Sequence, residues 1–365
     1  MNIEIYNSFS SDLEVRWRNF EKCSDLTVFQ TFDWINSWRK SFSNNKIKYQ
    51  IVFISENGED ILLFPLNIKK VYGVRVLEWI GNFYSDYHCP LIKKNTILTK
   101  NTFLNIWSDV KKKLEFFDTI HFIKQKDLIE NSRNPFTEFL SKSLYQDVFN
   151  INISDNYWPD YYKEKNNSKT RETDRRKNRK LNYGYETVFE IIVNKDEKEK
   201  MIENLISNKS FFYEKKKIYT NLASFNAKKF YKMINSLNSE HLITHLSILK
   251  KKNEILASNF GVCFENTFYY LIPYSYTGSL TKYSPGRYLL TKLIEWAFDN
   301  KFKKFDFTGG DEDYKKSWSN NHEYLYYYLN FSTIRGFIYC LIYKLINLAK
   351  KSKLLKKIYY KIIQL

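Results

Sequence analysis

The chain has 365 residues, more than one hydrophobic core usually serves, so two domains are expected. Hydrophobic residues make up 43% of it, which excludes an intrinsically disordered protein. The formal net charge of +18 fits a nucleic acid, an anionic membrane surface or a phosphate-bearing substrate as partner, but a coding bias toward Lys and Asn would produce the same charge.

The cellular setting is expected to be the cytoplasm. The four cysteines are scattered without a CxxC pair, which is typical of proteins in a reducing compartment. Residues 1–5 show no basic or apolar signal segment. The most apolar stretch, 336–349, is interrupted by Lys344 and is too short to span a bilayer.

Residues 1–160 are expected to form a first domain of mixed α/β type. Asn57-Gly58 between two apolar runs predicts a hairpin turn. The polar stretch 153–167 is interpreted as a linker. The predicted elements are a helix carrying Trp34 and Trp38, strands at 49–55, 59–69 and 74–80, a helix at 102–116 and a strand at 119–123.

Residues 161–332 are expected to form the second domain. Turns at 251–253 and 265–266 join three strands into an antiparallel meander, which a turn, a helix and one more strand follow. The predicted elements are a basic helix at 169–182, helices at 195–208 and 227–237, strands at 242–250, 255–264 and 267–274, a helix over 289–297 and a strand at 303–308.

The segment 282–290 predicts an anion site. Pro285 and Gly286 end the preceding strand, and the apolar residues that follow recur at helical spacing. The free N–H groups of a helix N-terminus attract an anion, and Arg287 adds a positive charge beside them. The next strand ends in Gly309-Gly310, which lets the backbone approach a ligand closely.

Residues 333–365 are interpreted as a basic amphipathic helical tail. Phe337, Leu341, Leu345 and Leu348 recur at helical spacing, and several lysines follow. This pattern is typical of a helix on an anionic membrane surface, and equally of a C-terminal helix docked on the protein's own core.

The order of these motifs resembles a known family. Tyr283-Ser284-Pro285-Gly286, Phe305-Asp306-Phe307 with Gly309-Gly310, and Asp313-Tyr314-Lys315 with Trp318 resemble the closing half of the acetyltransferase domain of the GNAT superfamily. Residues 29–38 and 171–181 resemble two further stretches of its tandem-domain branch, the CelD/BioF2-like acyltransferases, to which the FemAB peptidyltransferases are more distantly similar.

The resemblance implies two tandem GNAT-like domains with mixed, largely antiparallel sheets, and acyl-CoA as co-substrate of the second. It implies an N-acyltransferase that acylates a nucleotide-linked amino-deoxy sugar, with dTDP as the favoured nucleotide, for surface-polysaccharide biosynthesis. One alternative is a FemAB-like transferase that uses aminoacyl-tRNA. Another is an inactive basic protein associated with the membrane surface or with nucleic acid. No metal ion is expected, because no metal-ligand motif is present. No DNA partner is expected either.

Candidate residues for binding acyl-CoA surround the predicted turn. A thioester also needs donors that polarise its carbonyl, and the family resemblance assigns this to a backbone N–H where the strands near 260–262 and 270–274 separate. The predicted cofactor-binding residues are Tyr283, Ser284, Gly286, Arg287, Tyr288 and Lys315.

A base must remove a proton from the acceptor amine. His88 with Asp86 is one candidate, against the alternative of a solvated loop. Asp306 is another, against a structural hydrogen bond to the following glycine loop. We expect these residues of the two halves to face a common cleft. Tyr274 is the candidate that protonates the departing thiolate, although most tyrosines serve packing.

Candidate residues for the acceptor combine arginines and aromatic rings. Arg171, Arg175 and Arg179 recur every four residues, so they share a helix face that suits a diphosphate, or they form an ordinary solvated face. Tyr87, Tyr314 and Trp318 are predicted to pack against the sugar.

Overall fold

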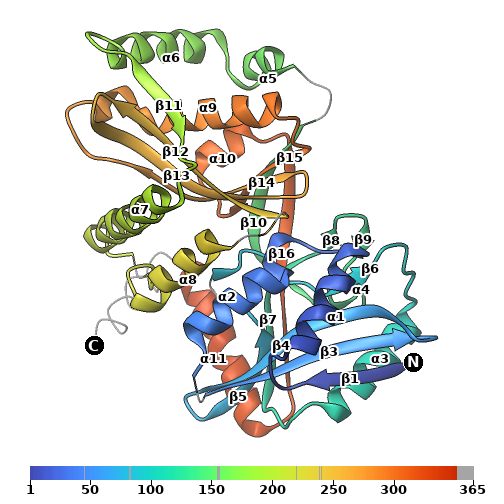
Figure 1. Ribbon diagram of the computed structural model, residues 1–365. Coiled ribbons are helices and arrows are strands. Elements are labelled where there is room, and N and C mark those ends of the chain that lie inside the picture. Colours follow the sequence, from blue (N-terminus) through green and yellow to red (C-terminus); the bar gives the residue numbers. More distant parts are fainter. Residues whose placement is uncertain are drawn as a thin grey trace. The chain divides into compact units, whose positions relative to one another are not determined.

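A computed structural model gives the fold of residues 1–351, except Asn45, 82–83, 154–156, Tyr219, Asn238 and Glu240 (Figure 1). The chain divides into two compact units that are not contiguous in sequence. Unit 1 comprises Met1–Ile35, Ser43–Tyr145 and the described residues from Tyr324 onward, and unit 2 comprises Asn36–Phe42 and Gln146–Glu323.

Unit 1 is a mainly antiparallel sheet in the order β1-β3-β4-β5-β7-β16, in which β5 and β7 pair in parallel. Its core joins Phe64 of the sheet to Phe103 and Trp107 of α3 and to Phe136. The predicted hairpin turn is confirmed, with Asn57 and Gly58 both at positive φ. The strands are β1 (Asn2–Tyr6), β2 (Ser24–Asp25), β3 (Ile47–Glu56), β4 (Glu59–Val71), β5 (Val74–Trp79), β6 (Leu91–Lys93), β7 (Thr119–Lys126), β8 (Leu128–Ile129), β9 (Ser132–Arg133) and most of β16 (Asn321–Phe331). The helices are α1 (Ser11–Lys22), the start of α2 (Phe32–Phe42), α3 (Lys100–Lys113), α4 (Pro135–Phe139) and α11 (Ile334–Lys351).

Unit 2 contains a sheet in the order β10-β15-β14-β13-β12-β11, in which β14 and β15 pair in parallel. Helix α9 packs against β12, β13 and β14, and α7 packs on the opposite face (Figure 1). Phe305 and Phe307 point into the core under α9 because alternate residues of a strand share one face. The strands are β10 (Ser143–Asn152), β11 (Thr187–Ile191), β12 (Leu242–Lys251), β13 (Glu254–Phe264), β14 (Thr267–Ser275) and β15 (Lys304–Gly309). The helices are α5 (Trp158–Lys165), α6 (Ser168–Leu181), α7 (Lys195–Lys215), α8 (Phe225–Ser236), α9 (Pro285–Asp299) and α10 (Asp313–Trp318).

Two strands pair with partners that lie far from them in the sequence. β10 precedes α5 and α6, yet it pairs antiparallel with β15 in unit 2. β16 follows α10, yet it pairs antiparallel with β7 in unit 1. Unit 1 therefore depends on β16, which the chain supplies after most of unit 2, whereas most of β10 begins the long segment of unit 2.

The predicted α/β class with largely antiparallel sheets is confirmed, and so are the meander and the helix after the 282–288 turn. The prediction of a linker over 153–167 is wrong in part, because α5 occupies Trp158–Lys165 with Pro at its first turn and a buried Trp158. β10 and β16 were not predicted. Helix α7 runs seven residues past its predicted end at 208.

The predicted tail helix is confirmed through Lys351 as α11, and residues 352–365 of that prediction lie outside the described residues. One side of α11 packs on unit 1, where Cys340 is buried and the Tyr339 hydroxyl lies 2.8 Å from His121 Nδ1. No helix within the described ranges has the length and apolar character needed to cross a bilayer.

Candidate active site

Strands β14 and β15 separate after a short parallel stretch. Their registered pairs run from Thr267 with Lys304 to Tyr269 with Asp306. On its other side β14 bulges, because the register with β13 shifts between Tyr270 and Ile272 and leaves Leu271 without an opposite residue. A bulged residue leaves the hydrogen-bond ladder locally disrupted. The separation and the bulge together place backbone polar groups beside a gap in the sheet. The prediction that the strands near 260–262 and 270–274 separate is wrong, because β13 and β14 stay paired on both sides of the bulge, as far as Ala257 with Ser275.

The N-terminus of α9 lies at the end of the turn that follows β14. Ser284 caps this 15-residue helix in the left-handed conformation, at φ 58° and ψ 54°, and Pro285 occupies the first turn. The N–H groups of Gly286 and Arg287 lie in that turn, where an α-helix provides no internal acceptor. Lys177 Nζ donates to Ser284 Oγ at 2.8 Å, so α6 contributes a cation at this point. The turn thus offers both N–H donors and positive charge to an anion.

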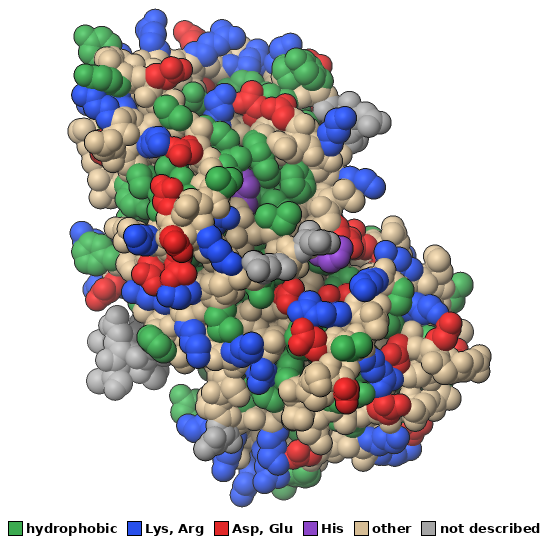
Figure 2. Space-filling view, viewed as in Figure 1, with side chains coloured by type: hydrophobic (Ala, Val, Ile, Leu, Met, Phe, Trp, Pro, Cys, Tyr) green, Lys and Arg blue, Asp and Glu red, His purple; other side chains and the backbone are tan. Residues whose placement is uncertain are grey.

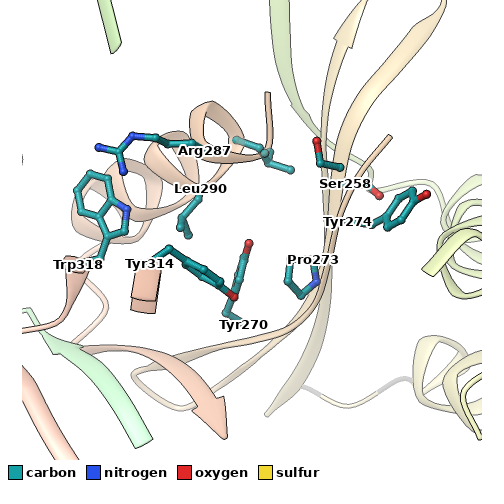
Figure 3. Close-up of a pocket in the computed structure, with 11 residues that line it drawn as sticks. Ser258, Tyr270, Pro273, Tyr274, Arg287, Leu290, Tyr314 and Trp318 are labelled. Carbon is teal, nitrogen blue, oxygen red and sulfur yellow. The ribbon is translucent and has the colours of Figure 1, made fainter. Parts of the chain in front are cut away.

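A cavity of about 300 Å³ connects the α9 N-terminus with β14 (Figure 3). Arg287, Leu290 and Trp318 lie on one side of it, and Ser258 and Pro273 on the other. Trp318 is buried, and its Nε1 has no hydrogen-bond partner among the described residues. Figure 3 shows this nitrogen on the side of the ring that faces Leu290. The cavity is therefore mainly apolar, with one unused N–H donor.

Arg287 does not carry a free charge at this site. Its guanidinium donates to both carboxylate oxygens of Asp174, at 2.9 Å each, and to Asn166 Oδ1 at 2.6 Å. It also lies over the Trp318 ring, with its Cζ 5.2 Å from the ring centroid. Asp174 compensates the positive charge, so Lys177 is the more available cation beside the turn. The other predicted cofactor residues of this turn, Tyr283 and Tyr288, flank the helix start.

Three tyrosines surround the gap in the sheet. Burial raises the pKa of Tyr270 well above its usual value, and it raises the pKa of Tyr274 and Tyr314 as well. All three therefore keep their protons near neutral pH. Tyr270 and Tyr314 point into the cavity, whereas the Tyr274 ring points toward α7 and meets Phe212 at 6.4 Å between centroids (Figure 3). Sequence reasoning missed Tyr270, which differs in no local pattern from the other tyrosines.

Two lysines approach the separated strands. Lys315 is buried, donates to Gly309 O at 2.6 Å and pairs with Glu312 Oε2 at 3.0 Å. Lys209 of α7 donates to Pro273 O at 2.8 Å. Sequence reasoning missed Lys209 because it lies one residue beyond the predicted end of that helix.

The structure places the candidate bases in different surroundings. Asp306 is buried in β15, and its Oδ1 accepts a hydrogen bond from Thr308 N at 2.7 Å. This is a structural hydrogen bond to the segment that leads into the glycine loop, the alternative to a catalytic role for Asp306. In unit 1, His88 is buried and lines a cavity of about 210 Å³ together with His121 and Glu78. Asp86 is half-buried, 3.9 Å from Lys124 Nζ. Tyr87 is fully buried and meets Phe29 edge-on at 5.4 Å.

The arginines of α6 divide into two kinds. Arg171 donates to the carbonyl oxygens of Asn166 at 2.6 Å and Lys163 at 3.3 Å, so it fixes the end of α5. Arg175 and Arg179 are exposed. Figure 2 shows Lys and Arg side chains along the upper edge of the view, where Figure 1 places α6. In the part of the chain that the structure describes, no group of His, Cys, Asp or Glu side chains is arranged to hold a metal ion.

Comparisons with known proteins agree with this geometry. Residues 168–316 match the family model of the acetyltransferase (GNAT) domain. A search of curated proteins found no match. Among solved structures, FemX is similar over 90% of this chain and 98% of its own, at 13% identity and a TM-score of 0.57. The C-terminal domain of a putative lysylphosphatidylglycerol synthetase from Agrobacterium fabrum is similar over 91% and 95%, at 10% identity and a TM-score of 0.53. A tandem GNAT protein from the clavulanic acid biosynthesis pathway is similar over 90% and 98%, at 7% identity and a TM-score of 0.51. These likenesses establish the fold.

Proposed function

We propose that this GNAT-type acyltransferase moves an acyl group from acyl-CoA to the amino group of a nucleotide-linked amino-deoxy sugar. The observation that carries the proposal is the cavity of about 300 Å³ between the α9 N-terminus and the separated strands. A CoA thioester is polyanionic at one end and neutral at the other. The helix N-terminus suits the first end, and the mainly apolar cavity suits the second.

In this proposal the CoA pyrophosphate binds the 282–288 turn through the N–H groups of Gly286 and Arg287, with Lys177 close by. The N–H groups of Tyr283, Ser284 and Tyr288 already donate to backbone carbonyls, and Pro285 has none. The pantetheine arm occupies the cavity, where Trp318 Nε1 donates to one of its amide carbonyls. The thioester lies at the β14 bulge, whose backbone N–H polarises the carbonyl. Attack by the amine nitrogen breaks the C–S bond, and Tyr270, Tyr274 or Tyr314 supplies a proton to the sulfur. Asp306, His88 and Asp86 remain candidate bases for the amine.

The sugar substrate is supported by the resemblance to CelD/BioF2-like acyltransferases and by the exposed Arg175 and Arg179. Arginine forks bind diphosphates in a bidentate manner. A dTDP-linked sugar in surface-polysaccharide synthesis, for O-antigen or capsule, is the acceptor that we favour. Tyr314 would supply aromatic surface near the reaction centre, with CoA as the co-substrate. The ring faces of Trp318 are covered by Trp158 and Arg287, so this side chain is assigned to the CoA side alone.

Two measurements test the proposal. Isothermal titration with CoA is expected to show binding at micromolar concentrations. A thiol-release assay with acetyl-CoA is expected to show turnover only when a dTDP-linked amino sugar is added. A folded protein that neither binds CoA nor releases thiol with any acceptor in a panel would contradict the function.

The second candidate is transfer of an aminoacyl group from tRNA, as in the FemAB-like alternative. The likeness to FemX and the exposed basic residues of α6 favour it. It predicts no use of CoA, and it predicts binding of charged tRNA that weakens steeply as salt is raised. An inactive basic protein would bind neither donor productively.

We also propose that α11 rests on an anionic membrane surface. Its apolar residues Ile334, Leu341, Leu345 and Leu348 are exposed, and Leu348 keeps 62% of its surface accessible. The sequence continues beyond α11 with four further Lys among apolar residues, Lys353, Lys356, Lys357 and Lys361. Exposed apolar side chains next to Lys favour anionic lipid over neutral lipid.

A further inference from the structure

Two lysines occupy the ends of the separated strands. Lys315 Nζ donates to Gly309 O, at the end of β15, and Lys209 Nζ donates to Pro273 O, two residues past the bulge in β14. Lys209 belongs to α7, so it reaches the gap from the sheet face opposite α9 (Figure 1). An acceptor that approaches from the α7 face would therefore meet Lys209 beside the thioester position.

The two lysines differ in their electrostatic surroundings. Lys315 forms an ion pair with the Glu312 carboxylate, with 3.0 Å between Nζ and Oε2. No carboxylate within the described ranges forms an ion pair with Lys209. Desolvation of the Lys209 ammonium and repulsion by Lys315 lower its pKa to about 8, against a smaller opposite effect of Glu312. Lys209 therefore releases its proton more readily than an ordinary lysine.

The other groups around Lys209 do not change this assignment. The Tyr213 ring centroid lies 5.5 Å from its Nζ, and the pKa of Tyr213 is raised, so this side chain is neutral. On α8, Lys232 pairs with Glu199 of α7, ten residues and about 15 Å along the helix from Lys209. On β13, Cys263 lies near Lys198 at the same distant end.

We propose that the neutral amine of Lys209 takes the first proton from the ammonium form of the acceptor. The inference rests on the proposed transfer to an amine and names a residue for its first step. The freed nitrogen lone pair forms the C–N bond with the thioester carbonyl carbon. The C–S bond then breaks with its electron pair on sulfur, and a second proton leaves the nitrogen and ends on that sulfur. The third proton stays on the amide, and Lys209 returns its proton to water.

The hydrogen bond to Pro273 O gives this amine a fixed orientation. A neutral lysine uses one N–H for that bond, and its lone pair takes no part in it. A base whose pKa lies near the operating pH accepts a proton and releases it again with little cost. An arginine at this position would keep the hydrogen bond and the charge but could not accept a proton.

The test compares Lys209→Arg, Lys209→Met and the control Lys200→Met, which changes an exposed lysine of the same helix. With acetyl-CoA and a dTDP-linked amino sugar, we expect kcat/KM of the unmodified enzyme to rise with pH through about 8. Both Lys209 variants are expected to lose about 10²–10⁴-fold in kcat/KM, with the CoA Kd and the thermal unfolding temperature retained. Lys200→Met should retain activity.

Activity of Lys209→Arg close to that of the unmodified enzyme would overturn the inference, since charge alone would then suffice. A second measurement does not depend on the acceptor: competitive acetic anhydride labelling of the whole protein across pH, read by mass spectrometry at Lys209. A labelling midpoint near pH 8 supports the proposal, and an ordinary lysine midpoint, about 10.4, overturns it. Failure of CoA binding by the unmodified protein would instead count against the proposed function.

Discussion

Trp318 illustrates how a single side chain prepares a site. Its ring stacks on Trp158 at 6.1 Å between centroids and carries the Arg287 guanidinium, so its position is fixed from two sides. Its Nε1 remains without a partner in the described part of the chain. A buried donor left unsatisfied costs about 1–3 kcal/mol. A ligand that supplies an acceptor in the cavity would remove that cost.

Trp318→Phe is expected to weaken CoA binding about fivefold, since a net hydrogen bond contributes about 1 kcal/mol and 1.4 kcal/mol is a factor of ten. Isothermal titration with CoA measures the effect. Trp107→Phe is the matched control, because Trp107 in unit 1 is also buried with an unpartnered Nε1. Equal Kd values for both variants would show that the Trp318 indole N–H does not contact CoA.

His245 shows the opposite case, a buried polar group that costs stability. It packs against Trp296 at 4.4 Å and Phe268 at 5.1 Å between centroids, and neither ring nitrogen has a partner among the residues described. Burial, and to a smaller extent the charge of Lys198, lower its pKa to about 3. The unfolded chain binds this proton at about pH 6.5, so stability is complete above pH 6.5 and falls as the pH drops toward 3.

His245→Leu is therefore expected to make unfolding less sensitive to acid. Between pH 6.5 and 5 the unmodified protein should lose about 2 kcal/mol through this histidine, at 1.36 kcal/mol for each pH unit. Urea unfolding at both pH values measures the difference. His241→Leu, at an exposed histidine, should leave the pH dependence unchanged. An identical pH dependence in His245→Leu and the unmodified protein would contradict the assignment.

At the scale of elements, the junction of β14 and α9 is the central feature. Ser284 turns the chain in the left-handed region, Pro285 begins the helix, and Gly286 lies against β14. A Cβ built on Gly286 would come within 3.2 Å of Ser275 Cβ, so a side chain here would require the helix start and the strand to move apart by a few tenths of an ångström. The absence of a side chain keeps the N–H groups of α9 next to the cavity.

Gly286→Val should raise the CoA Kd at least tenfold while the protein stays folded, because the branched side chain pushes the helix N-terminus away from β14. Ser275→Gly removes the atom that the valine would meet, so the double variant Gly286→Val/Ser275→Gly should recover part of the affinity. Titration with CoA, together with circular dichroism, checks both. An unchanged Kd in a folded Gly286→Val variant would place the cofactor elsewhere.

At the scale of the whole molecule, α11 presents apolar side chains to solvent while its other side packs on unit 1. Phe337, Leu341, Leu345 and Leu348 all keep about half of their surface or more accessible. Monomeric proteins rarely expose a continuous apolar stripe of this kind without a partner for it. The high positive charge of the chain makes anionic lipid the favoured partner.

We expect the protein to sediment with vesicles that contain phosphatidylglycerol and not with pure phosphatidylcholine vesicles, and to release as salt is raised. The variant Leu341→Ser/Leu345→Ser/Leu348→Ser should lose this binding. Ile97→Ser, at another exposed apolar residue, is the control. Equal binding by the triple variant and the unmodified protein would show that α11 does not carry the contact.

Much of the fold was open to prediction from local patterns. Helical spacing of apolar residues predicted α2 and α9, and the spacing of arginines predicted α6. Apolar runs bounded by turn residues predicted β3, β4 and the meander of β12, β13 and β14, and β3, β4 and β13 are buried over most of their length. The turn before α9 was predicted from Pro285 and Gly286, whose backbone preferences act without tertiary contacts. β10 and β16 were missed, because their pairing partners lie far away in the sequence.

The sequence by itself determined most of the element types, the α/β class and the position of the turn before α9, all of which depend on neighbouring residues. Only the tertiary structure decided which charges at the site are available. Asp174, distant in sequence, compensates Arg287, whereas Lys209 comes to the strand gap without a carboxylate partner in the described part of the chain. Charge compensation and pKa depend on distance and burial, and these follow from how remote segments pack.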